Sequence, residues 1–465
     1  MKTQGVVGVK KKQSRKSHSS NNQFQKRREV MKASSIIRMG VAVVVGLVLV
    51  AGSTYGQTLR NRGVFRNTGT STYNNIENYR TGTAGTILNS GSLTVNNTLD
   101  NDDGATAQGT IRNYIGGLAA GTLTVTSAFT NEGGSFYNDS TTYVPVLNLG
   151  GTITSTGTFD TDAGKVVYTG AGGQTIFGTT YGALVAAGSN TKTLGASLAV
   201  NDSLRINSTL AVSTYTLTVN APTGIYGVGG TLNGGSGTGT VNYAANANQA
   251  VYPSTLYNNL TLSGAAVQRN KQAGGAVTVA GTLTVGSNDS LDVTGAFALS
   301  GTLQNSGGVK LGGSADLTGA TLTTPGTFVY YAAVGQTVAP AAYADLILRD
   351  STGTKTFTAG QTYSVSGSLV LERFGRSGAS FGAASIFKYV GTGTQTVAAL
   401  DYALLEFEQA GQKNVSGWVN SSGVTIASTA TPGGVYVAAT GTLRVVGGDL
   451  TNDGVLTNDG TVTVQ

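Results

Sequence analysis

The chain has 465 residues, of which 69 are Gly, only 6 are Pro and 11% are charged. An average soluble domain has roughly 25% charged residues and roughly 7% Gly, so long solvated helices are excluded, and the shortage of Pro without a three-residue Gly period excludes collagen. Short runs of Val, Leu, Ile and Tyr recur throughout and argue against disorder. The composition therefore favours many short strands joined by tight turns.

The formal charge of +7 belongs to the beginning of the chain. Eleven of the 29 basic residues precede residue 57, where Glu29 is the single acid, so the remainder has 29 − 11 = 18 basic and 22 − 1 = 21 acidic residues. The net charge of the body is thus −3. We expect no basic face for nucleic acid and no nucleic-acid partner.

Residues 31–56 have the pattern of a signal peptide, with a basic stretch followed by an uninterrupted apolar run over residues 41–51. Eleven apolar residues suit a signal peptide and fall short of the roughly 20 that span a bilayer, although a membrane anchor is the alternative. Residues 1–30 form a basic extension, and Met31 is an alternative start. We expect cleavage between Ser53 and Gln57, giving a secreted or cell-surface protein without a transmembrane span.

The body lacks the side chains used by many enzymes. There is no Cys, and the one His, His18, lies in the leader. Disulfides, thiolate or His-ligated metals, and Ser-His-Asp or Cys-His catalysis are therefore excluded for the body.

A short repeat begins in residues 57–164, the first segment of the body, and continues to the end of the chain. It consists of a Gly turn and a strand in which the third and fifth residues are apolar and share one face. Clusters at Asn89, Asn452 and Asn458 precede Gly, and we interpret these Asn residues as corner residues that tolerate positive φ. The repeat occurs at residues 91–95, 121–125, 281–285, 367–371, 441–445 and 460–464.

A longer repeat, here called the Tyr/Gln unit, occurs four times in residues 165–465, starting near residues 165, 240, 327 and 386. Each unit has a Tyr, a Gln six residues later, a second Tyr, and a Leu three residues beyond it; Lys follows at a similar distance in three units. The unit residues are Tyr168, Gln174, Tyr181 and Leu184; Tyr243, Gln249, Tyr257 and Leu260; Tyr330, Gln336, Tyr343 and Leu346; and Tyr389, Gln395, Tyr402 and Leu405.

A constant motif at irregular intervals is typical of a solenoid, to which turns can be added without altering the neighbours of the motif. We therefore predict an all-β fold, a right-handed parallel β-helix, with tandem small β-sandwiches as the alternative. The Tyr and Gln residues either form an exposed ladder for stacking on sugars, or fill the solenoid corners and hydrogen-bond neighbouring backbone.

The Gly-Thr-Leu-Thr-Val strands, the Asn-Asp-Gly corners and the motif at residues 389–397 resemble the repeat regions of bacterial extracellular proteins of the adhesin and autotransporter-passenger kind. The resemblance covers roughly residue 60 to the end. It implies a surface-exposed β-helix that contacts cell-surface or matrix components, including polysaccharide. A C-terminal membrane barrel and a sorting domain, found in some of these proteins, are not evident here.

Two sets of acidic residues are candidates for chemistry. Asp100 and Asp102, and Asp160 and Asp162, alternate before a Gly as in calcium loops, and Ca²⁺ is the one cofactor considered; plain polar turns are the alternative. Glu406 and Glu408 share one face of a strand and are the candidate carboxylate pair of a glycoside hydrolase or polysaccharide lyase.

Two functions remain from different classes. We favour a non-catalytic structural or adhesive rod over a carbohydrate-degrading enzyme, because the charged residues are spread thinly along the body. Coils of about 20 residues predict a rod on the order of 95 Å long. The strand at residues 460–464 has no cap after it, which predicts either truncation of a longer reading frame or end-to-end self-association.

Overall fold

The computed structural model describes most of the chain after residue 56. The chain divides into two compact units, Met1–Tyr55 and Gly56–Gln465, and the second unit contains all the described residues. The leader features, including His18 and the apolar run, lie outside the described residues. The described residues are 57–78, 85–101, 109–115, 119–138, 140, 142–264, 266–324, 326–349, 353–372, 378–409, 412–416, 418–426, 435–437, 439, 442–445, 449–452 and 455–465.

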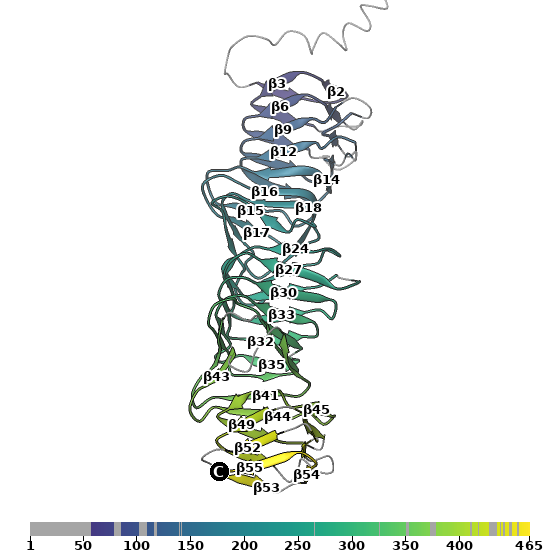
Figure 1. Cartoon of the computed structure of the whole chain (residues 1–465). Coiled ribbons are helices and arrows are strands. Elements are labelled where there is room, and N and C mark those ends of the chain that lie inside the picture. Colours follow the sequence, from purple (N-terminus) through teal and green to yellow (C-terminus); the bar gives the residue numbers. More distant parts are fainter. Residues whose placement is uncertain are drawn as a thin grey trace, which may run out of the picture. The chain divides into compact units, whose positions relative to one another are not determined.

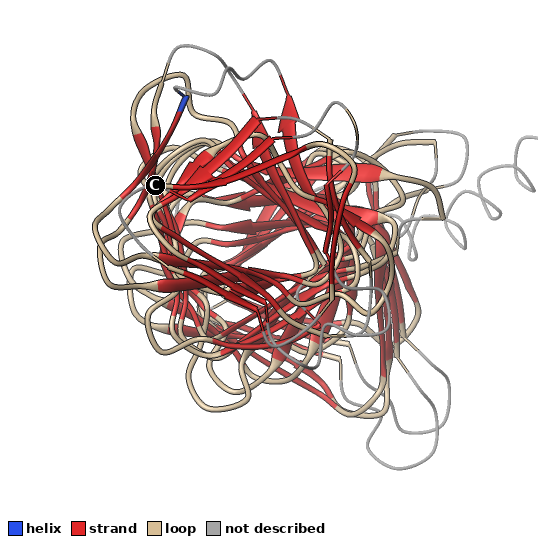
Figure 2. Ribbon diagram, turned by 60° about the horizontal axis from the view of Figure 1, so that its bottom comes forward, coloured by secondary structure: helices blue, strands red, loops and turns tan. Residues whose placement is uncertain are grey.

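The second unit is a parallel β-solenoid of about 18 turns, and its described residues contain no α-helix. The strands follow one another along the stack in chain order (Figure 1) and overlie each other around a common interior (Figure 2). Pairings between the named strands are parallel, and the one antiparallel bridge in the described residues joins Tyr114 to Ala120. This confirms the predicted β-helix and overturns the sandwich alternative, which requires antiparallel hairpins.

The longest series of parallel strand pairings changes face at its three long strands, whose second halves continue the N-terminal part of the series and whose first halves lead into its C-terminal part. Its members are β3 (Thr70–Tyr73), β6 (Ser92–Val95), β9 (Thr122–Val125), β12 (Val146–Leu149), β14 (Thr158–Tyr168), β16 (Thr180–Ala186), β18 (Leu198–Ile206), β20 (Thr216–Val219), β23 (Thr240–Tyr243), β26 (Asn259–Leu262), β29 (Thr282–Val285), β32 (Thr302–Asn305) and β35 (Thr321–Thr324).

Two further rows complete the N-terminal turns. The first contains β1 (Thr58–Arg60), β4 (Asn75–Glu77), β7 (Thr98–Asp100), β10 (Ala128–Asn131) and β13 (Thr152–Ser155). The second contains β2 (Val64–Asn67), β5 (Thr86–Asn89), β8 (Thr110–Arg112) and β11 (Ser135–Tyr137), and continues through the first halves of β14, β16 and β18 to β20.

Two other rows carry the surfaces discussed below. The first contains β24 (Gln249–Val251), β27 (Arg269–Ala273), β30 (Asp289–Val293), β33 (Gly308–Leu311), β36 (Thr327–Tyr330), β39 (Asp345–Arg349) and β42 (Leu369–Glu372). The second contains β38 (Ala342–Tyr343), β41 (Thr362–Val365), β44 (Ile386–Tyr389), β47 (Leu404–Phe407), β50 (Val424–Ile426) and β53 (Leu450–Asn452).

The core follows the alternation predicted from the short repeat. In β6, Leu93 and Val95 are buried while Ser92 and Thr94 are partly exposed, and the same pattern occurs in β9 and β29. The inward side chains of successive turns form one continuous apolar cluster. The final strand, β55 (Thr461–Val464), departs from this pattern, because it stacks on one side only, against β52 (Thr442–Val445), and Val464 stays 51% exposed.

The interpretation of the corner Asn residues as positive-φ residues is wrong in the described part of the chain. The non-glycine residues with positive φ there are Ser213, Ala384 and Gln409. Asn89 is instead the buried last residue of β5. Asn suits this place because its amide both donates and accepts hydrogen bonds between stacked turns.

Candidate functional site

The Tyr/Gln units are polar clusters inside the core. In the first unit the hydroxyl oxygens of Tyr168 and Tyr181 lie 3.0 Å apart. The Phe177 backbone N–H donates to the Tyr168 hydroxyl at 3.0 Å, and the Tyr181 hydroxyl donates to the Phe177 carbonyl at 2.6 Å. The two rings therefore hold the chain between them in a fixed turn.

The Gln of the same unit joins this turn to the preceding one. The Gln174 Oε1 atom accepts from the Gly170 N–H at 2.7 Å. Its Nε2 atom donates to the carbonyls of Leu149 and Gly151 at 3.0 and 2.8 Å. Both N–H groups and the carbonyl oxygen of this buried amide are thus hydrogen-bonded to the backbone.

All four units repeat the tyrosine pair. The paired tyrosine hydroxyls lie 3.0, 3.2, 3.0 and 2.9 Å apart, and all eight rings are buried, as the structural interpretation of the repeat expects. Burial raises the pKa of Tyr168, Tyr330 and Tyr389 to about 12, although hydrogen bonds donated to their hydroxyls oppose the shift. The buried rings present no stacking surface for sugars.

A buried lysine completes each unit, a role that the sequence left unassigned. Lys192, Lys271, Lys355 and Lys413 each pair in register with the Gln of the preceding turn. Each Nζ donates to the carbonyl two residues after the first Tyr, at 2.7, 2.5, 2.6 and 2.8 Å respectively. A signal was present, since Lys follows Gln by 18, 22, 19 and 18 residues, which is one turn of the solenoid.

The second unit differs because its lysine faces a carboxylate. Lys271 Nζ lies 3.6 Å from Asp289 Oδ1, and both side chains are almost fully buried. Desolvation lowers the pKa of Lys271, and the Asp289 charge opposes that shift. In the first and fourth units, burial lowers the pKa of Lys192 and Lys413.

Two ladders of buried Asn side chains connect the N-terminal turns by hydrogen bonds. Sequence reasoning missed both ladders. The Nδ2 atom of each Asn donates to the Oδ1 atom of the next one at 2.6 to 2.8 Å. The ladders end just before the first Tyr/Gln unit. Their members are Asn61, Asn78, Asn101 and Asn131 in one, and Asn67, Asn89, Asn113 and Asn138 in the other.

The candidate carboxylates Glu406 and Glu408 lie on the outer face and share one cation. Lys388 Nζ, on the neighbouring strand β44, lies 2.6 Å from Glu406 Oε2 and 2.9 Å from Glu408 Oε1. The hydrogen bond to Glu406, and to a smaller extent the one to Glu408, raises the pKa of Lys388. Both carboxylates thus converge on one side chain, whereas a glycosidase pair must flank the scissile bond.

Of the two candidate calcium loops, the one at Asp160 and Asp162 lies fully within the described residues. Asp160 Oδ1 accepts a hydrogen bond from the Asp162 backbone N–H at 3.3 Å. The pKa of Asp162 is raised mainly by burial and also by the negative charge of Asp160. Asp100 ends β7, and Asp102 lies outside the described residues. Among the described residues there is no group of three or more His, Cys, Asp or Glu side chains placed to hold a metal.

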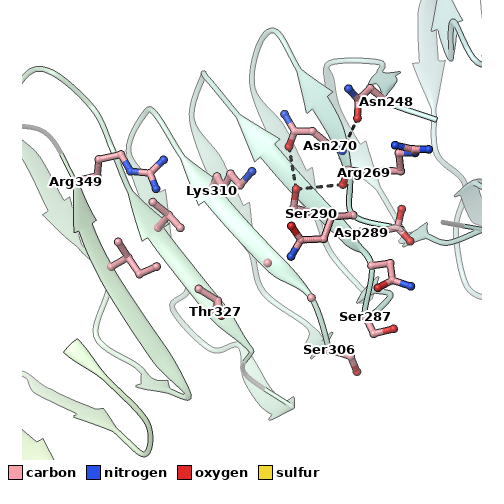
Figure 3. A pocket seen from close by; sticks show the side chains of 16 residues that line it. Asn248, Arg269, Asn270, Ser287, Asp289, Ser290, Ser306, Lys310, Thr327 and Arg349 are labelled. Atoms are coloured by element: carbon pink, nitrogen blue, oxygen red, sulfur yellow. Dashed lines mark hydrogen bonds between the residues drawn. The ribbon is translucent and has the colours of Figure 1, made fainter. Parts of the chain in front are cut away.

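A polar groove of about 580 Å³ crosses the outer face of the row from β27 to β39 (Figure 3). Arg349 and Arg269 lie at opposite ends, and Lys310 lies between them. Hydroxyl and amide side chains form most of the remaining lining. These are Asn248, Gln268, Asn270, Ser287, Asn288, Ser290, Ser306 and Thr327.

Hydrogen bonds fix the polar wall of this groove. The Ser290 hydroxyl donates to Asn270 Oδ1 at 2.9 Å, and Asn248 Oδ1 accepts from the Asn270 backbone N–H at 2.9 Å. Asn270 Nδ2 donates to Asp292 Oδ2 at 3.1 Å. The wall is therefore preorganised. Sequence reasoning missed the groove, because its residues come from six separate turns.

The fold places this chain in the class of parallel β-solenoid proteins. Comparison with models of protein families, with curated proteins and with solved structures found no match to the chain. In the part of the chain that the structure describes, no helix has the length and apolar character needed to cross a membrane.

Proposed function

We propose that this chain is an exported, non-catalytic structural or adhesive protein that acts through the repetitive outer surface of its solenoid. The observation that carries the proposal is that the most regularly repeated polar residues are buried and hold the solenoid together, and do not form a site on its surface. The Tyr/Gln/Lys units and the Asn ladders are buried and join one turn to the next, which suits a protein whose product is a durable surface.

Export is supported by the leader pattern at residues 31–56 and by the absence of Cys from the body. The partners are cell-surface or matrix components, including polysaccharide. No nucleic-acid partner is proposed, because the body carries a net charge of −3, from 18 basic and 21 acidic residues.

Fractionation of producing cells tests export. We expect the chain at the cell surface or in the medium, with an N-terminus between Thr54 and Gln57. A variant lacking residues 41–51 serves as the control and should stay inside the cell. Recovery of an extracellular product that retains residues 41–51 would contradict the proposal.

The enzymatic alternative rests on Glu406 and Glu408. Both accept hydrogen bonds from Lys388, which leaves each carboxylate engaged on the same side of the strand. We expect no release of reducing or unsaturated ends when the protein is incubated with neutral and acidic glycans. Release that is lost in Glu406→Gln or Glu408→Gln, and kept in Glu132→Gln, would establish the enzyme instead.

A further inference from the structure

We propose that the groove over β27 to β39 binds an acidic polysaccharide, a chain of carboxylated or sulfated sugars, through Arg269 and Lys310. The inference names one partner for the adhesive function and rests on that function for its biological setting. Binding itself is a property of the groove and is measured separately.

The charges of the groove favour an anion. Arg269, Lys310 and Arg349 line it with the carboxylate Asp289, and a second carboxylate, Asp292, lies beside Lys310 and accepts hydrogen bonds from Asn270 and Tyr331; the body as a whole is net acidic. Asp289 lies 3.6 Å from Lys271 Nζ, so its charge is matched within the core. The groove therefore has an excess of positive charge on an otherwise weakly acidic surface, with Arg269 and Lys310 as its cations outside ion pairs among the described residues.

Two of the cations are available to a ligand. Among the described residues, Lys310 forms no ion pair, and the buried Nε of Arg269 has no hydrogen-bond partner. The Arg269 side chain as a whole is only partly buried, so its terminal guanidinium N–H groups can donate to a carboxylate or sulfate oxygen. Arg349 Nε forms an ion pair with Glu372 Oε2 at 2.5 Å, so we assign it no direct contact with the ligand.

The floor of the groove leaves room for an extended chain. At Gly308 a Cβ atom would make only ordinary van der Waals contacts, with Ser290 Cβ at 3.6 Å and the Thr327 carbonyl oxygen at 3.8 Å, so a side chain can be introduced here without a clash. The groove crosses five neighbouring strands, and four strand spacings amount to roughly 19 Å. That length suits several consecutive sugars rather than a single small anion.

The lining favours sugars over nucleic acid. Hydroxyl and amide groups such as Ser287, Asn270 and Ser290 match the many hydroxyls of a glycan. No aromatic side chain is among the lining residues, although single-stranded nucleic acid is bound largely by stacking on aromatic rings. Acidic polysaccharide is therefore the polyanion that this lining fits best.

The test measures binding of the full chain to polygalacturonate and to dextran sulfate, with neutral dextran and single-stranded DNA of similar length as comparisons. Calorimetry gives Kd, and hydrogen exchange locates the protected segments. We expect binding to at least one acidic glycan and protection of β30 and β33. Which of the two glycans binds decides between carboxylate and sulfate as the recognised group.

Two groove variants and one matched control test the residues. Arg269→Gln combined with Lys310→Gln should weaken binding by at least about tenfold. Gly308→Leu should weaken it by filling the floor, at unchanged net charge. The control, Lys165→Gln combined with Arg205→Gln, removes two charges from the outer faces of β14 and β18 and should leave binding and protection unchanged.

Each remaining outcome overturns the inference. Equal weakening by the groove pair and the control pair means that only general charge attraction acts, including that of the eleven basic residues before residue 57. The proposal is also wrong if neutral dextran binds equally well or if DNA binds more strongly. It is likewise wrong if the segments protected from exchange lie outside β27 to β39. Thermal melts of each variant separate lost binding from lost folding. None of these results bears on export, so the function proposed above is tested independently.

Discussion

The paired hydroxyls of Tyr168 and Tyr181 show how this core tolerates polar groups. A buried hydroxyl without a partner is costly, but these two bond each other and the Phe177 backbone. The same pairing recurs in the other three units. Large aromatic rings thereby fill the solenoid corners without leaving unsatisfied oxygens.

The effect of these tyrosines on stability is pH-dependent. Burial raises the pKa of all eight above 10.0, and that of Tyr168 to about 12. In the unfolded chain they lose protons near pH 10, so folding stability is full below pH 10 and falls as the pH rises towards 12. The lowered pKa of Lys192 and Lys413 acts in the opposite direction, but on fewer groups.

We therefore expect cooperative alkaline unfolding that begins above pH 10. Circular dichroism and phenolate absorbance measured together provide the check. The phenolate signal of the buried tyrosines should appear with the loss of β-structure. Ionisation of all tyrosines near pH 10 in a chain that keeps its β-spectrum would be inconsistent with this account.

A single hydroxyl of a unit can be tested directly. Tyr168→Phe removes the partner of the Tyr181 hydroxyl and of the Phe177 N–H, and should destabilise the protein by about 1–3 kcal/mol. Tyr226→Phe is the matched control, since that ring is 44% exposed. Urea unfolding measures both. Equal stability of the two variants would show that the buried pair contributes nothing.

At the scale of the element, strands of three or four residues need help from their neighbours. The strand β5 has four residues, and its last one, Asn89, bonds Asn67 on one side and Asn113 on the other at 2.8 and 2.7 Å. The ladder adds side-chain hydrogen bonds along the same direction as the backbone pairing. Each turn is thus fixed in register at its corner.

Asn89→Ala interrupts this ladder in the middle. It leaves Asn67 Nδ2 without its Asn acceptor and Asn113 Oδ1 without its Asn donor, so we expect a loss of about 3 kcal/mol. Asn96→Ala, at an exposed position, should cost less than about 0.5 kcal/mol. Thermal or urea unfolding distinguishes them, and similar losses in both variants would argue against the ladder.

The spacing of turns depends on glycines at points of close approach, of which Gly151 is the tightest among the described residues. A Cβ atom at Gly151 would lie 1.1 Å from the Ser127 carbonyl oxygen, whereas one at Gly63 would meet nothing within 4 Å. Gly151→Ala should therefore destabilise by about 2 kcal/mol or more, because backbone must move. Gly63→Ala is the control, and equal unfolding midpoints would show that the turn yields freely.

The sequence predicts the elements better than the contacts between them. Apolar residues at alternate positions, such as Leu93 and Val95, are enough to predict strands and an inward face. The role of Asn89 was misread, because corner conformation and ladder formation favour the same residue. The groove depends on which residues of separate turns come into register, and variable turn lengths hide that from a sequence.

At the scale of the whole second unit, each turn is stabilised by the turns on either side of it. Each strand pairs with its counterparts in the neighbouring turns, as β5 pairs with β2 and β8. Such a stack behaves as a one-dimensional array, whose stability is a sum of local terms and neighbour interfaces. The N-terminal turns are held by Asn ladders and the later ones by Tyr/Gln/Lys units, so the two parts need not unfold together.

A local defect should therefore stay local. Hydrogen exchange should rise in β2, β5 and β8 for Asn89→Ala, because they share its ladder, and remain unchanged in β44 and β47. Tyr389→Phe should give the mirror result, since its hydroxyl bonds Tyr402 and the Ala398 N–H at the other end of the stack. Both variants are measured at one pH and temperature against the unaltered chain. If either raises exchange equally in β5 and β44, the unit unfolds as a single cooperative block and the array description is wrong.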